Sequence, residues 1–150
     1  MAEKTAVLTD KAPKPLAGIY SQAIKANGFV FVSGAVPMDP ETMKIVNGDI
    51  QAHTVSWKTS LVYRPRPADR YLFWRQHQCI KNLAAILEAS GSDITKVVKV
   101  NVFLSNMDDF AAMNEIYSQY WGEVKPCRTC VAVKTLPLNV DVEIECTATY

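Results

Sequence analysis

The chain has 150 residues, a length typical of one domain and sufficient for a sizeable hydrophobic core. Its 16 basic and 15 acidic residues give a formal net charge of +1, which excludes the strongly basic surface typical of nucleic-acid-binding proteins. No apolar run approaches the ~20 residues that span a bilayer, and four cysteines are too few for a disulfide scaffold. Residues 1–15 lack the apolar stretch of a secretory signal, so we predict a cytoplasmic protein and leave a mitochondrial pool open.

Hydrophobic patterns in the first two thirds of the chain predict a strand, a helix and a second strand. Residues 29–33 form a β-branched and aromatic run that ends at Gly34, which predicts a strand. Apolar residues at positions 80, 83, 84 and 87 have helical spacing, and Gly91 follows as a helix terminator. Apolar and polar residues then alternate over 98–104, which predicts the second strand.

The last third predicts one more helix and two more strands. The helix begins near Asn106, a good N-cap residue, and ends at Gly122. Its apolar stripe consists of Phe110, Met113, Tyr117 and Trp121. Residues 130–133 and 140–147 are the predicted strands, and the latter has an apolar face and an opposite face that carries Glu143 and Glu145. This order predicts an α+β fold with one mixed sheet and two helices on one face. The other face is too mixed for water alone or a core alone, so we expect an oligomer to form on it.

Residues 55–76 interrupt the first predicted helix. They contain Pro65, Pro67 and four arginines, and a proline costs about 3 kcal/mol or more inside a helix. Without this segment the apolar stripe runs unbroken from Asp49 to Gly91. Val-Ser at its start can be encoded by a splice-donor sequence, and Gln at its end by a splice acceptor. We hypothesise that 55–76 is a translated, unspliced intron within a single domain of residues 1–150; the alternative is a genuine surface insertion.

Cys127 and Cys130 form a C-x-x-C pair around Arg128. The pair by itself suggests redox chemistry or half a zinc site, but there is no second pair with ligand spacing. An offset of three in a strand also places the two side chains on opposite faces. We therefore expect no metal site here.

Arg128, Glu143 and Tyr20 each have a structural and a functional interpretation. Arg128 lies at the start of an apolar strand, where it could pair with Glu143 or Glu145, or bind a substrate carboxylate with its planar guanidinium. Glu143 could face solvent, or act as a general base for water in a closed pocket. Tyr20 could be a plain surface aromatic, or cover a small pocket with its ring.

Outside 55–76 the chain resembles the RidA (YjgF) family of reactive-imine deaminases. The resemblance rests on Gly-Ile-Tyr-Ser-Gln-Ala at 18–23, Val-Ser-Gly at 32–34, the segment 102–114, and Lys-Pro-Cys-Arg-Thr-Cys-Val-Ala-Val at 125–133, followed by Leu-Pro and Val-Asp-Val-Glu-Ile-Glu. It implies a chorismate-mutase-like fold, a homotrimer with sites between subunits, and no metal or organic cofactor. The implied reaction converts a 2-imino acid such as 2-iminobutanoate or 2-iminopropanoate, or its enamine, into the 2-oxo acid and ammonia. Pyridoxal-phosphate enzymes such as threonine dehydratase release these substrates.

The resemblance also implies roles for individual residues. Arg128 matches the carboxylate-binding arginine, and Glu143 matches the glutamate associated with the hydrolytic water. Further pocket positions are matched by Tyr20, Ser33, Asn114 and Cys130. Cys127 and Thr129 replace the small residues that usually flank the arginine, which is a mild departure. We assign no nucleophilic role to the Cys130 sulfur.

Two other functions compete with deamination. Some members of the family are described as translation inhibitors or ribonucleases, and others as chaperone-like binding proteins. A nuclease needs a surface that binds phosphate, which the arginines near Pro65 could offer, but these lie in the atypical segment. We therefore favour the deaminase and expect neither a membrane nor a nucleic-acid partner.

Overall fold

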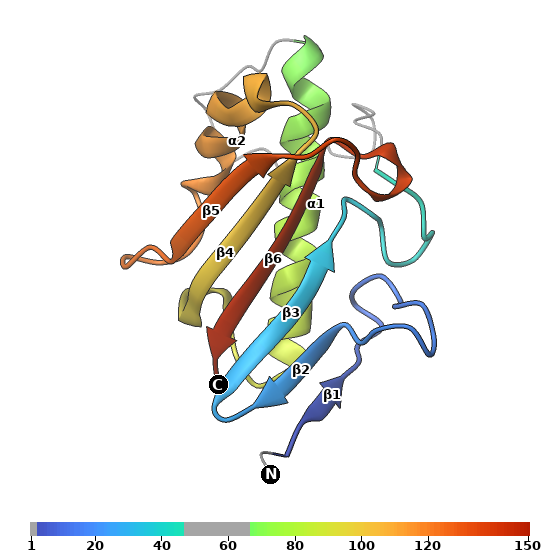
Figure 1. Ribbon diagram of the computed structural model, residues 1–150, viewed down its shortest axis with the longest axis vertical. Coiled ribbons are helices and arrows are strands. Elements are labelled where there is room, and N and C mark those ends of the chain that lie inside the picture. Colours follow the sequence, from blue (N-terminus) through green and yellow to red (C-terminus); the bar gives the residue numbers. More distant parts are fainter. Residues whose placement is uncertain (1–2, 47–66) are drawn as a thin grey trace.

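The computed structural model describes residues 3–46 and 67–150, with the side chains of the second range described from residue 74. Its centre is one six-stranded mixed sheet with strand order β1-β2-β3-β6-β4-β5 (Figure 1). β4 and β5 run parallel, and the other neighbouring pairs are antiparallel. The strands are β1 (Thr5–Val7), β2 (Ala23–Ala26), β3 (Phe29–Ala35), β4 (Val97–Leu104), β5 (Cys127–Ala132) and β6 (Val142–Thr149).

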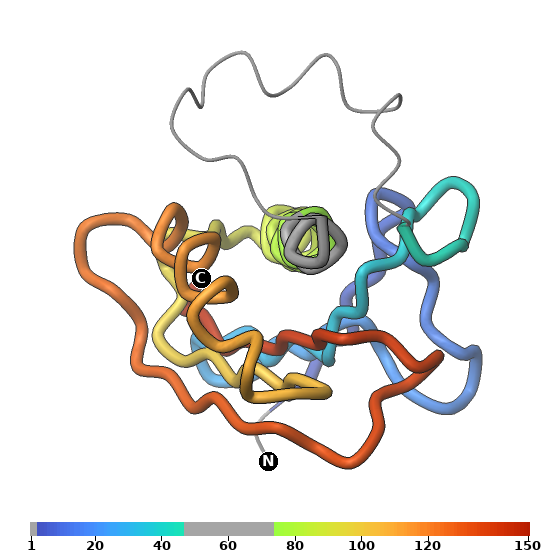
Figure 2. Tube along the Cα trace, turned by 90° about the horizontal axis from the view of Figure 1, so that it is seen from above, coloured from blue at the N-terminus to red at the C-terminus, as the bar shows by residue number. Residues whose placement is uncertain are grey.

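Two helices, α1 (Pro67–Ala89) and α2 (Phe110–Tyr117), cover the same face of this sheet (Figure 2). Strand alternation determines which side chains they cover: Val142, Ile144 and Cys146 of β6 are buried under the helices, whereas Glu143 and Glu145 lie on the face that no helix covers. The predicted α+β fold, one mixed sheet with two helices on one face, is confirmed. We call the uncovered side the open face of the sheet.

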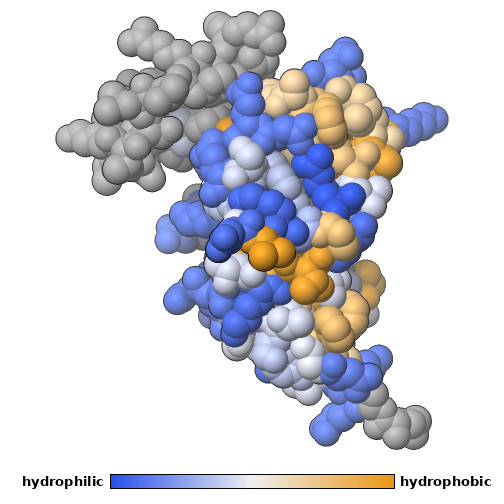
Figure 3. All heavy atoms as spheres, turned by 90° about the vertical axis from the view of Figure 1, so that its left-hand side faces the viewer, coloured by the Kyte–Doolittle hydropathy of each residue, from blue (hydrophilic) through white to orange (hydrophobic). Residues whose placement is uncertain are grey.

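The open face is only partly polar. Phe31 on β3 and Val131 on β5 are 50% and 41% exposed. Figure 3 shows apolar side chains gathered along one margin of the side that carries β5 and α2. Exposed apolar side chains beside polar ones are typical of a surface that contacts another protein.

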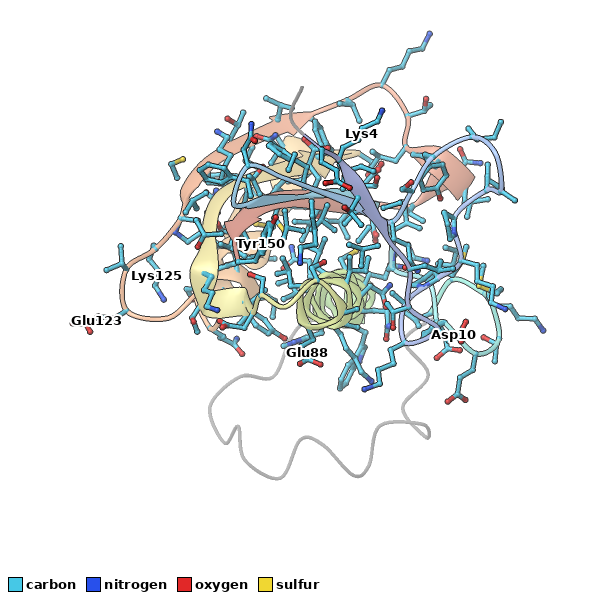
Figure 4. The ribbon with its side chains drawn as sticks, turned by 90° about the horizontal axis from the view of Figure 1, so that it is seen from below. Lys4, Asp10, Glu88, Glu123, Lys125 and Tyr150 are labelled. Carbon is cyan, nitrogen blue, oxygen red and sulfur yellow. The ribbon has the colours of Figure 1, made fainter. Side chains whose placement is uncertain are left out.

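Helix α1 differs from its prediction at its beginning. It begins at Pro67, which the helix tolerates because a proline at the first turn lacks an N–H that would have had no helical partner. Residues 67–76 are therefore helical, although we expected the prolines of 55–76 to break this helix. Leu83 and Leu87 are fully buried against the sheet, while Glu88 points away from it (Figure 4). The remainder of the atypical segment, 55–66, and the predicted helix start at Asp49 lie outside the described residues.

The second helix is shorter than predicted. Asn106 acts as an N-cap, but of a 3₁₀ turn, η3 (Met107–Asp109), that leads into α2. The helix ends at Tyr117 because the chain then turns, with positive φ angles at Trp121 and Gly122. The Lys125 ammonium binds the carbonyl oxygens of Tyr120 and Gly122, each at 2.9 Å, and so closes the turn.

The remaining described elements are two short 3₁₀ turns, η2 (Ile94–Lys96) and η4 (Pro137–Asn139). No helix within the described residues is long and apolar enough to cross a membrane.

Candidate active site

Arg128 lies on β5 beneath α2 and is held there by a hydrogen bond and by two aromatic rings. Its Nη1 donates a hydrogen bond to Oδ1 of Asn114 at 2.7 Å. Its guanidinium carbon lies 4.5 Å from the ring centroid of Tyr117 and 5.5 Å from that of Phe110. Stacking on aromatic rings fixes the plane of a guanidinium and leaves its edge available. Within the described residues, Nε and Nη2 bond to no partner, so these two nitrogens remain to donate to a carboxylate.

No carboxylate pairs with Arg128 in the described part of the chain. Register explains this: Arg128 lies opposite Val100 of β4, whose side chain faces the helices, whereas Glu143 and Glu145 face the other way. The structural interpretation of Arg128 as an intrachain partner of either glutamate is therefore wrong. An unpaired, half-buried guanidinium is better suited to binding an anion from outside.

The two cysteines beside Arg128 lie on opposite faces of β5, as predicted. Cys130 is half-buried and packs against the core, whereas Cys127 is exposed and donates from Sγ to the carbonyl oxygen of Val98. Burial raises the pKa of the Cys130 thiol, and the nearby Arg128 charge lowers it by less. The thiol therefore stays protonated near neutral pH, which makes it a poor nucleophile.

Glu143 lies on the open face above Gly34 of β3. A Cβ atom at position 34 would be 1.9 Å from Oε1 of Glu143, so only glycine leaves room for the carboxylate. The register between β3 and β6 shifts here, between Val32 and Ala35. Burial raises the pKa of the Glu143 carboxyl, and the like charge of Glu145 raises it further. A carboxylate of raised pKa is a stronger base than an ordinary one.

Ser33 adjoins Gly34 on β3, and a hydrogen bond connects it to the segment that carries Tyr20. The Ser33 hydroxyl donates to the carbonyl oxygen of Ser21 at 2.7 Å, so its proton is used within the chain. Tyr20, one residue before Ser21, is 48% exposed. A hollow of about 160 Å³ opens farther along the same face, between Lys99, Asn101 and Glu145.

The six predicted site residues thus form two groups on opposite faces of the sheet. One group lies on the helix side and comprises Arg128, Asn114 and Cys130. The other lies around β3 and β6 and comprises Glu143, Ser33 and Tyr20. The sheet separates them, so one copy of the chain does not bring the arginine and the glutamate together.

Two contributors to this site were not predicted from the sequence. Tyr117 was interpreted only as part of an apolar stripe, because nothing in the sequence shows that Arg128 stacks on it. Gly34 was interpreted only as a strand terminator, although its position next to Ser33 in the Val-Ser-Gly motif could have marked it. Among the described residues, no three His, Cys, Asp or Glu side chains form a group that could hold a metal ion.

Comparison with known proteins gives a consistent set of relatives. The family model described as endoribonuclease L-PSP matches residues 9–60 and 70–150. A RutC family protein of Pyrococcus abyssi is 44% identical over 97% of this chain and 96% of its own. The chloroplastic Reactive Intermediate Deaminase A of Arabidopsis thaliana is 40% identical over 98% of this chain and 66% of its own.

Solved structures agree with these matches. Yeast Mmf1 superposes with a TM-score of 0.79 at 39% identity, covering 98% of both chains. Escherichia coli TdcF, solved with bound serine, superposes with a TM-score of 0.74 at 28% identity, covering 97% of this chain and 98% of its own.

Proposed function

Because the chain belongs to the endoribonuclease L-PSP family, which is the RidA (YjgF) family, we propose that it hydrolyses 2-imino acids, or their enamine tautomers, to 2-oxo acids and ammonia. The observation that carries the proposal is the Arg128 guanidinium, which Asn114 and Tyr117 orient while its Nε and Nη2 remain unused by the described residues. A 2-imino acid offers the carboxylate that such a fork binds.

The chemistry requires only orientation and a base. Arg128 holds the substrate carboxylate and so fixes the position of the neighbouring C=N carbon. Glu143 takes a proton from water as the water oxygen adds to that carbon, which gives a carbinolamine. The substrate is the protonated imine, so this carbinolamine is neutral. Glu143 returns its proton to the nitrogen, and the C–N bond breaks as the hydroxyl oxygen gives its own proton to Glu143. That proton leaves with the ammonia, the carboxylate is restored, and the 2-oxo acid is the second product. This sequence balances without a metal, an oxidant or an organic cofactor.

Two relatives support the substrate class. The Arabidopsis protein is named as a deaminase of reactive intermediates, and TdcF was solved with serine, a small amino acid of similar size to the proposed substrates. We propose 2-iminobutanoate and 2-iminopropanoate as substrates, with pyridoxal-phosphate dehydratases as the enzymes that supply them. We also propose a cytoplasmic location, and the mitochondrial and chloroplastic names of two relatives leave a mitochondrial pool open.

The two groups of site residues also support self-association. A complete site needs Arg128 from one face and Glu143 from the other, and a second copy packed on the open face would supply the missing group. We propose a cyclic homotrimer, in which every site lies between two subunits.

The atypical segment bears on activity, and we propose that 55–76 is foreign to the family core. The break in the family match at 61–69 lies within it. Arg75 and Gln76, however, are incorporated into α1: Arg75 pairs with Asp141, and Gln76 is buried. A form lacking 55–76 must therefore rebuild the start of α1 from the residues before the deletion.

A coupled assay tests the proposed function. Threonine dehydratase generates 2-iminobutanoate, and the release of 2-oxobutanoate is followed with the full chain, with the form lacking 55–76, and without either. We expect acceleration by the full chain that is lost in Arg128→Ala and partly kept in Arg128→Lys. No acceleration by either form would contradict the deaminase and favour the ribonuclease or chaperone-like alternatives. Acceleration by the shortened form alone would show that the segment disables the site.

A further inference from the structure

One buried side chain holds the loop that precedes β2. Gln22 is only 3% exposed, and its Oε1 accepts a hydrogen bond from the backbone N–H of Thr9 at 2.7 Å. Its Nε2 donates to the carbonyl oxygens of Thr9, Ala12 and Pro13 at 3.0, 3.3 and 2.9 Å. A single carboxamide therefore satisfies four backbone groups of a loop that lacks a strand partner at these positions. Asp10, between these residues, points outward (Figure 4).

The same residue is tied to β3 through its backbone. The N–H of Ser33 donates to the carbonyl oxygen of Gln22 at 3.0 Å, and the Ser33 hydroxyl donates to the carbonyl oxygen of Ser21 at 2.7 Å. These two bonds continue the pairing of β2 with β3 beyond the last paired residues, Ala23 and Val32. They fix the backbone immediately after Tyr20.

The connection continues to the proposed base. Ser33 is followed by Gly34, whose missing side chain leaves the space in which the Glu143 carboxylate lies. A shift of Ser33 would move Gly34 with it, because the two share a peptide bond. Gln22 is thus linked to Tyr20 on one side and, through Ser33 and Gly34, to Glu143 on the other.

We propose that Gln22 is a positioning residue, which keeps Tyr20 and Glu143 in a fixed relation to each other. This inference rests on the proposed deaminase function, in which Tyr20 contacts the substrate and Glu143 the water. Gln22 itself touches neither reacting group, because its side chain is directed into the Thr9–Pro13 loop. A purely structural role would lower the amount of folded protein but would leave the kinetics of the folded fraction unchanged.

The first test is kinetic and uses the full chain. Gln22→Leu has a similar volume but forms none of the four hydrogen bonds. We expect kcat/KM to fall at least tenfold through both a higher KM and a lower kcat. In a double-mutant cycle, Tyr20→Phe should have a smaller effect in the Gln22→Leu background than in the wild type, because Tyr20 is already displaced. Additive effects would contradict action through Tyr20.

Two controls separate positioning from folding. Gln119→Leu removes a glutamine on the exposed side of the α2 end and should leave kinetics unchanged. Ile86→Val removes one methyl group from the core and lowers stability without touching the loop. If Gln22→Leu loses no more activity per folded molecule than Ile86→Val, the inference is overturned.

The second test needs no substrate. In Gln22→Leu, Gly34 is held less firmly, so water reaches the Glu143 carboxyl. The raised pKa of this carboxyl should therefore fall towards the ordinary value, as measured by carbon NMR. A wild type without deaminase activity would contradict the proposed function, while this fall would still support the linkage. An unchanged Glu143 pKa together with wild-type kinetics would overturn the positioning role of Gln22.

Discussion

At the scale of single residues, Gly34 is important because it has no side chain. The Glu143 carboxylate occupies the space where any other residue would place its Cβ, at 1.9 Å from Oε1. Because φ at Gly34 is ordinary, alanine there meets no backbone strain, and its three closest contacts among the described residues are all with this side chain. We expect Gly34→Ala to keep the fold and to lower kcat at least tenfold, because Glu143 must rotate away.

The measurement is a comparison of kcat with the midpoint of urea unfolding. Gly28→Ala is a matched control, since a Cβ there meets nothing within 4 Å, although its positive φ should cost some stability. Full activity in Gly34→Ala would show that the carboxylate position is unimportant for turnover.

The pair of glutamates on β6 predicts a pH effect. Burial raises the pKa of Glu143, and the Glu145 charge raises it further. Because the proposed base must be ionised to take a proton from water, we expect activity to fall as pH drops through the pKa of Glu143. Glu145→Gln removes the like charge and still accepts the hydrogen bond from Asn101, so the acidic limb of the kcat/KM profile should move to lower pH.

The profile is measured with and without the substitution, and Glu88→Gln serves as the control. Glu88 points from α1 away from the sheet, so its charge should not affect the limb (Figure 4). A limb that moves to higher pH, or stays in place, would remove Glu143 as the titrating base.

At the scale of elements, Arg75 attaches the first half of α1 to the sheet. Its Nη1 lies 3.0 Å from Oδ2 of Asp141, with both side chains about one-fifth exposed, and its Nε donates to the carbonyl oxygen of Val46 at 3.4 Å. Arg75→Met keeps the aliphatic stem but leaves the carboxylate without this cation. We expect a loss of about 1–3 kcal/mol in the free energy of unfolding, between the values for exposed and buried pairs.

Urea unfolding at one fixed protein concentration measures this loss, because assembly makes stability concentration-dependent. Asp141→Asn in the Arg75→Met background should restore part of it by removing the unpaired charge. If Arg75→Met is as stable as the wild type, α1 does not depend on this ion pair. Other residues could then take the place of 67–76 at the start of the helix.

The length of a hydrophobic pattern decides whether an element can be predicted from the sequence. β4 and β6 each have eight residues of clear alternation, and both were predicted to within two residues at either end. β1 and β2 were missed, because three and four residues are too few to show a period. The end of α2 was placed too late, since Trp121 is buried by a turn and continues the apolar stripe without being helical.

The candidate site was predictable as a set of residues but not as an arrangement. Motifs pointed to Arg128 and Glu143, and alternation placed Glu143 on the polar face of its strand. Nothing in the sequence relates the faces of β5 and β6, because these strands follow each other in the chain but do not pair with each other in the sheet. Their separation by the sheet became visible only through the registers of β4 with β5 and with β6.

At the scale of the whole molecule, this separation predicts that the proposed activity is a property of the assembly. If each site takes Arg128 from one subunit and Glu143 from its neighbour, Arg128→Ala and Glu143→Gln are each inactive alone but complementary when mixed. Random mixing of equal amounts in a cyclic trimer should give intact sites in about a quarter of all positions, and therefore about a quarter of wild-type activity.

The two variants are unfolded together and refolded as one mixture, so that the subunits exchange. Mixing Arg128→Ala with the double variant Arg128→Ala/Glu143→Gln is the matched control, since no subunit then supplies the arginine and no site can recover. Recovery in the first mixture and none in the second would require sites shared between subunits. Inactivity of the first mixture, with trimers present by sedimentation, would mean instead that no site takes Arg128 from one subunit and Glu143 from its neighbour, and would contradict the proposed shared site.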